Sequence, residues 1–188
     1  MLIMRLFLAI TIPQEIQIRI SKLTNYFEPH GISIVEEAAY HITLLFLGER
    51  TEEDIGKILA AVRHAAEPFA PFVVSIEGVS CFTMESPRVV YLSVGKGSDQ
   101  IKRLHSQLES GFLQSGIRLK KEKGFIPHLT IARVRRLADK ERILSFANEH
   151  RVEKLGTFTA TGCSLMLSST TSRGPSYSSL YEAQFLGA

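Results

Sequence analysis

Apolar and polar residues follow two periods along this chain, an alternation typical of strands and a three-to-four-residue spacing typical of amphipathic helices. The alternating or continuously apolar runs predict strands at residues 2–10, 32–35, 40–47, 72–82, 88–94, 157–168 and 177–185, and one within 124–133. The helical spacing predicts helices that end near Phe27 and Ala66, a third ending near Gln114, and a shorter one at 138–148. Strands and helices in this order predict an α+β fold.

Several polar residues and glycines predict where these elements begin and end. Thr11 with Gln14 fits a capping box at the start of the first helix. Thr51 and Ser98 are suitable caps for the second and third helices. We expect Gly48 to end the strand at 40–47, and Gly116 to close the third helix.

The second half of the chain repeats the order helix, loop, strand and helix found in the first half. No low-complexity linker or break in composition divides the chain. We therefore expect one domain, 1–188, made of two similar lobes. Each lobe would be an antiparallel sheet backed by helices, and the two would meet at a central cleft.

Two short segments have nearly the same sequence. The first is His41-Ile42-Thr43-Leu44, and the second is His128-Leu129-Thr130-Ile131. Successive side chains of a strand point to opposite faces, so each histidine shares a face with its threonine while the apolar residues point into the core. Two such strands facing one another would surround one cleft with two imidazoles and two hydroxyls. The competing interpretation is that both are ordinary half-buried strand histidines.

Two histidines in one cleft suit acid–base chemistry on a phosphate. Histidine titrates near pH 6.5, so one imidazole can accept a proton while the other donates one. Cleavage of a phosphodiester needs both acts, and threonine hydroxyls can donate hydrogen bonds to the non-bridging oxygens. This division of labour requires no metal ion.

Composition narrows the remaining classes of protein. The net charge of +3 tolerates an anionic partner without requiring one. The apolar start of the chain is interrupted by Arg5 and followed by Pro13, so we interpret it as a buried strand and not as a signal peptide. No apolar run is long enough to predict a membrane span. Cys81 and Cys163 lack the spacing of a disulfide framework or zinc site, and a cytoplasmic protein is expected.

The residues around the two motifs resemble a known family. The first motif continues as Phe-Leu-Gly-Glu at 46–49, and the second is preceded by Pro127 and followed by Ala132-Arg133. These features resemble the RNA 2′,3′-cyclic phosphodiesterases, also called 2′-5′ RNA ligases, of the two-histidine phosphoesterase superfamily. The segments at 5–10, 87–92 and 169–177 are also similar to that family, so the resemblance covers essentially the whole chain.

The resemblance implies a bilobal α+β fold with both motifs in the central cleft. It implies hydrolysis of RNA 2′,3′-cyclic phosphate ends, tRNA fragments among them, to 2′-phosphates by a monomer without a metal or other cofactor. His41 would be the proton donor to the 3′ leaving oxygen, and His128 the proton acceptor that activates water. Thr43 and Thr130 would hold the phosphate. The sequence itself does not decide which histidine is the acid.

Other residues carry less specific signals. Arg133 would reach the phosphate by the same resemblance, but it lies an odd number of residues after His128, so a bulge or strand end is required. Phe7 could stack on the terminal base or belong to the core. The other four histidines are expected at the surface: His30, His64, His105 and His150. A basic cluster that could attract RNA comprises Arg118, Lys120, Lys121, Lys123, Arg135 and Arg136.

Three alternatives to hydrolysis of RNA ends remain open at this point. The fold could be an RNA-binding module without turnover. The same site could join RNA ends through 2′-5′ linkages, which is the reaction run in reverse. The substrate could also be another small cyclic or 2′-5′ nucleotide.

Overall fold

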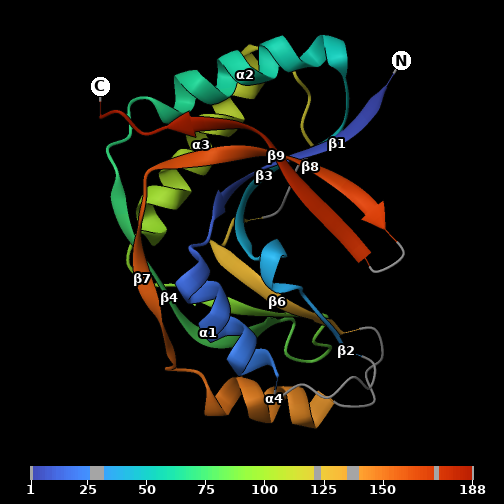
Figure 1. Cartoon of the computed structure of the whole chain (residues 1–188), viewed down its shortest axis with the longest axis vertical. Helices are drawn as coiled ribbons and strands as arrows, with labels where there is room; N and C mark the ends of the chain where they lie inside the picture. Colours follow the sequence, from blue (N-terminus) through green and yellow to red (C-terminus); the bar gives the residue numbers. More distant parts are fainter. Residues whose placement is uncertain (1, 26–31, 121–123, 135–139, 172–173, 188) are drawn as a thin grey trace.

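The computed structural model describes residues 2–25, 32–120, 124–134, 140–171 and 174–187, and it confirms the α+β class (Figure 1). The helices are α1 (Gln14–Thr24), α2 (Glu52–Ala66), α3 (Ser98–Gln114) and α4 (Lys140–Glu149), with a 3₁₀ turn at Glu37–Ala39. The strands are β1 (Ile3–Thr11), β2 (Ile32–Ile34), β3 (His41–Thr51), β4 (Phe72–Phe82), β5 (Val89–Val94), β6 (His128–Val134), β7 (Lys154–Ala160), β8 (Gly162–Thr171) and β9 (Gly174–Gln184).

The strands of the described residues form one antiparallel sheet in the order β7-β4-β5-β6-β3-β1-β8-β9, with β2 paired to β6. This corrects the expectation of two separate sheets. The two halves, β7-β4-β5-β6 and β3-β1-β8-β9, are joined at the β6–β3 boundary, where Ile42 and Leu129 are the paired residues. We call these the first and second half-sheets. The sheet is narrow at this boundary, and a single domain of two lobes stays a prediction.

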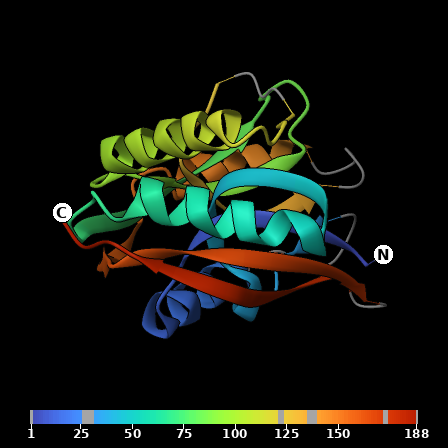
Figure 2. The same cartoon turned by 90° about the horizontal axis from the view of Figure 1, so that it is seen from above.

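The half-sheets do not correspond to the halves of the chain, which is a second correction. The second half-sheet combines β1 and β3 from the start of the chain with β8 and β9 from its end. Helices α2 and α3 pack on each other and on this half-sheet, whereas α1 and α4 contact the first one (Figures 1 and 2). The repeated order of elements along the chain therefore comes from strands that cross between the half-sheets.

The alternation along β1 shows how the sequence builds two faces. Leu6, Leu8 and Ile10 are at most 2% exposed and belong to the main core beneath the helices. Phe7 and Ala9 are also buried, but they form a second small cluster with Met166 on the opposite face of the sheet. Because β1 is buried on both faces of the sheet, apolar side chains are needed at successive positions, which explains its continuous apolar run.

The predicted caps are only partly correct. Thr51 precedes α2 as expected, and its backbone N–H donates to Asp54 Oδ2 at 3.2 Å. Thr11 still belongs to β1, and Pro13 occupies the N-cap position of α1. Gly97 precedes α3, so Ser98 is the first helical residue.

Two predicted strand limits are wrong because hydrogen-bond partners, not side-chain patterns, decide them. Strand β3 continues through Gly48, where a φ of +74° suits glycine and accompanies a shift of register against β1. The single strand expected at 157–168 is two strands. Residues up to Ala160 pair with β4. Those from Gly162 onward pair with β9 on one side, and residues 164–168 also pair with β1 on the other.

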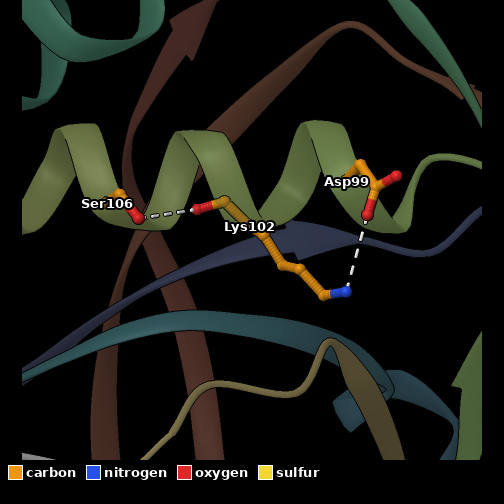
Figure 3. Close-up of polar contacts among 3 residues, drawn as sticks. All are labelled: Asp99, Lys102 and Ser106. Carbon is orange, nitrogen blue, oxygen red and sulfur yellow. Dashed lines mark hydrogen bonds and ion pairs between the residues drawn. The ribbon is translucent and has the colours of Figure 1, made fainter.

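Helix α3 shows how the described helices divide between core and solvent. Ile101, Leu104, Leu108 and Phe112 are fully buried. The opposite side carries local contacts, with Lys102 Nζ 3.5 Å from Asp99 Oδ1 and Ser106 Oγ donating to the Lys102 carbonyl (Figure 3). Such exposed pairs contribute little stability, so burial of the apolar stripe holds α3 in place. Among the described residues, none of the helices has the length and apolar character of a membrane span.

Replacing Phe112 by Ala should destabilise the fold by about 3–5 kcal/mol, because the ring is completely buried and its loss leaves a cavity. The adjacent Leu113 is 77% exposed, and Leu113→Ala should change the free energy of unfolding by no more than about 0.5 kcal/mol. Urea unfolding of both variants measures the difference. Equal effects would contradict the placement of α3.

Candidate active site

The β3–β6 boundary brings the two His-x-Thr motifs together. Ile42 and Leu129 are paired and fully buried, so the residues before and after each of them point to the opposite face. In an antiparallel register this places His41 across from Thr130, and Thr43 across from His128. We call this surface the motif face. Each histidine is therefore adjacent to the threonine of its own motif and across from the threonine of the other.

His41 is held by its own strand. Its Nδ1 lies 2.7 Å from the Ala39 carbonyl oxygen, and because a carbonyl only accepts, Nδ1 carries the proton. Its Nε2 is 3.0 Å from Thr43 Oγ1. In the neutral ring Nε2 accepts from that hydroxyl, and in the charged ring it donates to it. Nε2 is thus the atom at which His41 can gain or lose a proton on the motif face.

The surroundings of His41 lower its pKa below the usual value. Burial is the largest cause, because removal from water disfavours the charged ring. The hydrogen bond to Ala39 opposes this, while the positive charges of His128 and Arg133 lower the pKa further. For their charges to lower the pKa of His41, the His128 and Arg133 side chains must lie near the His41 ring.

His128 repeats this arrangement on β6. Its Nδ1 lies 2.7 Å from the Ile126 carbonyl oxygen, again the residue two positions earlier. The ring is flanked by Phe82 at 4.8 Å and Tyr91 at 5.4 Å between centroids, both edge-to-face. Phe82 and Tyr91 come from β4 and β5 and were not expected from the sequence. Both lie in predicted strands, but only the sheet order places them beside His128.

A bulge in β6 places Arg133 on the motif face. Tyr91 pairs with Thr130 and Val90 pairs with Ala132, so the register passes over Ile131. Ile131 and Ala132 are both fully buried, and Arg133 is exposed opposite Val89. The extra residue offsets the odd separation from His128. This is the bulge that a role for Arg133 required.

Phe7 lies against the first motif. Its ring centroid is 4.9 Å from His41 and 5.0 Å from Tyr177, and the side chain is only 3% exposed. Phe46, opposite Phe7 on β3, is 50% exposed, with the two centroids 6.1 Å apart. Stacking of a base on Phe7 stays a prediction, and Phe46 is the neighbouring ring with free surface.

The remaining predicted groups are the basic cluster, the other histidines and the two cysteines. Arg118 and Lys120 are exposed, whereas Lys121, Lys123, Arg135 and Arg136 fall outside the described residues, as does His30.

Cys81 and Cys163 are both buried, and burial raises the pKa of their thiols to about 11 and about 12. Within the described part of the chain, no three His, Cys, Asp or Glu side chains gather in a group able to hold a metal ion.

Known proteins are similar to this chain over nearly its whole length. An RNA 2′,3′-cyclic phosphodiesterase of Methanocaldococcus jannaschii is 30% identical over 179 residues, 95% of this chain and 99% of the relative. One of Archaeoglobus fulgidus is 32% identical over 94% of this chain and 98% of its own.

Solved structures show the same fold. A crystal structure of a Thermus thermophilus protein superposes with a TM-score of 0.81 at 29% identity, covering 98% of this chain and 99% of that one. E. coli LigT in complex with 3′-AMP gives 0.79 at 23% identity over 98% and 99%, a likeness of fold. Residues 12–170 match the family described as the 2′-5′ RNA ligase superfamily. The chain therefore belongs to the 2′-5′ RNA ligase superfamily.

Proposed function

We propose that this protein hydrolyses RNA 2′,3′-cyclic phosphodiester ends to 2′-phosphomonoesters by metal-independent acid–base catalysis. The observation that carries the proposal is the crossed arrangement of the two motifs. Both imidazoles have Nδ1 committed to a backbone carbonyl, so Nε2 is the nitrogen through which each ring can exchange a proton. Relatives of nearly equal length are RNA 2′,3′-cyclic phosphodiesterases, which supports the choice of substrate.

The reaction needs one histidine in each protonation state. Neutral His128 accepts a proton from water as the water oxygen bonds to phosphorus. Charged His41 donates its proton to the 3′ oxygen as the bond between that oxygen and phosphorus breaks. The products are a 2′-phosphate and a 3′-hydroxyl. The lowered pKa makes the charged His41 a stronger acid and also reduces the fraction of rings that are charged at neutral pH.

The phosphate would lie between the two motifs. The hydroxyls of Thr43 and Thr130 donate hydrogen bonds to its non-bridging oxygens, and the Arg133 guanidinium supplies a positive charge on the same face. With a 5′-hydroxyl of RNA in place of water as the nucleophile, the same displacement would join two ends through a 2′-5′ linkage. Action as a monomer, a cytoplasmic location and tRNA fragments as substrates stay part of the proposal.

The first test is turnover of an RNA ending in a 2′,3′-cyclic phosphate, with EDTA present. Wild type should yield the 2′-phosphate, and His41→Ala and His128→Ala should each lose roughly a hundredfold or more in rate. His64→Ala, at an exposed position of α2, is the matched control and should keep full activity. Loss of activity in EDTA that only added metal restores would contradict the metal-free mechanism. Binding without turnover by wild type would indicate an RNA-binding module.

The second test follows the charge on His41. Arg133→Met removes a positive charge that disfavours the imidazolium, so the pKa of His41 should rise, although burial still holds it down. NMR titration of the imidazole signals measures this shift. Because His41 must be charged to donate its proton, the basic limb of the pH–rate profile should move to higher pH together with it. An unchanged His41 titration would show that Arg133 is not close enough to assist the phosphate.

The third test separates the two aromatic rings near His41. Phe46→Ala should raise KM for a cyclic-phosphate RNA by roughly tenfold if the exposed ring stacks on a base. Phe7→Leu should mainly lower kcat, because Phe7 packs against His41 and has almost no free surface. A larger rise in KM for Phe7→Leu than for Phe46→Ala would instead make Phe7 the base-stacking residue.

A further inference from the structure

His105 is a buried histidine that takes no part in the proposed chemistry. It lies on α3 and is only 7% exposed, which corrects the expectation of a surface residue. Its position follows from helical spacing, since it lies four residues after Ile101 and three before Leu108. The helical spacing of the sequence therefore indicated a buried position, although histidine is a polar residue that suggested an exposed one.

The His105 ring reaches the first motif. Its Nδ1–H donates to the Leu44 carbonyl oxygen at 2.7 Å. Leu44 follows Thr43 directly, and the β1 register passes over it, because Ala9 pairs with Thr43 and Leu8 with Leu45. A buried carbonyl at such a bulge needs a donor from outside the strand pair, and His105 supplies it.

The same ring reaches the segment before the second motif. It stacks on Phe125 with centroids 3.9 Å apart and planes 8° apart. Phe125 lies three residues before His128 and packs against the main core. One side chain of α3 thus contacts both segments that carry the motifs, from the side opposite the motif face.

The third contact of His105 lies within its own helix. Its Nε2 lies 3.3 Å from Glu109 Oε2, one helical turn further along α3. Both ring nitrogens therefore face acceptors, a carbonyl and a carboxylate.

We propose that His105 is a positioning residue that sets the separation and orientation of the two motifs. Within the described residues, the register of β3 against β6 contains one residue pair, Ile42 and Leu129. His105 adds a second connection by holding Leu44 and Phe125 at once. This inference rests on the proposed function for its kinetic consequence, but its structural consequence can be measured without substrate.

The kinetic test uses variants that separate the contacts of His105. His105→Phe keeps a ring of similar size against Phe125 but lacks the donor to Leu44, and Phe125→Leu removes the stacking partner. Both should lower kcat on cyclic-phosphate RNA by about tenfold to a hundredfold with KM nearly unchanged, because small displacements of acid and base slow catalysis strongly. His105→Gln, which keeps an amide donor, should recover part of the loss.

Two controls distinguish positioning from general stability. Ser106→Ala alters the neighbouring exposed residue, whose hydroxyl donates to the Lys102 carbonyl within α3. Ser75→Ala removes a buried hydroxyl that accepts from the Lys96 N–H at 2.7 Å, in the first half-sheet and away from the motifs. Both variants should keep the kcat of wild type, even where Ser75→Ala lowers the urea midpoint as far as His105→Phe does.

The substrate-free test records the NMR signals of the His41 and His128 imidazoles in each variant. His105→Phe and Phe125→Leu should shift both sets of signals, and Ser106→Ala should shift neither. If His105→Phe fails to fold, Phe125→Leu and His105→Gln carry the test. Unchanged imidazole signals in the folded variants, or a kcat within about twofold of wild type, would overturn the proposal. If wild type itself does not turn over the RNA, the proposed function fails and the NMR signals alone decide.

Discussion

The site depends on the short backbone pairing between β3 and β6 at Ile42 and Leu129. Because both side chains are buried, the pairing sends the four polar residues of the two motifs to the other face. Because it is antiparallel, it crosses the motifs. A parallel pairing would place histidine beside histidine. The crossed arrangement instead separates the two imidazoles by hydroxyls, which suits groups that act on opposite sides of one phosphate.

Bulges decide which other side chains reach this face. In β6 the register passes over Ile131, so Ile131 and Ala132 are both buried and Arg133 joins the motif face. In β3 the register passes over Leu44, and Leu44 and Leu45 are both buried. Bulges of this kind commonly occur next to active sites, where they redirect a side chain. Here they let a strand bury two successive apolar residues without losing the alternation beyond them.

The electrostatics of the motif face favour an anion. Two imidazoles and a guanidinium lie close enough for His128 and Arg133 to lower the pKa of His41. The positive charges of His41, His128 and Arg133 repel one another. A bound phosphate would reduce this repulsion, so the same charges would favour binding of an anion. The backbone carbonyls of Ala39 and Ile126 accept from Nδ1 of the two rings and so fix how the rings are oriented.

The sequence by itself determined the element types, the pairing of each histidine with its threonine on one face, and the apolar stripes of the helices. These are local properties, since strand alternation and helical spacing depend only on nearby residues. Tertiary structure alone decided the single continuous sheet, the crossing of chain halves between half-sheets, and the position of Arg133. It also decided the contacts of His105 with Leu44 and Phe125, although helical spacing already places His105 on the buried stripe of α3. Hydrogen-bond partners, strand order and bulges depend on residues far apart in the chain, and no periodicity within one segment records them.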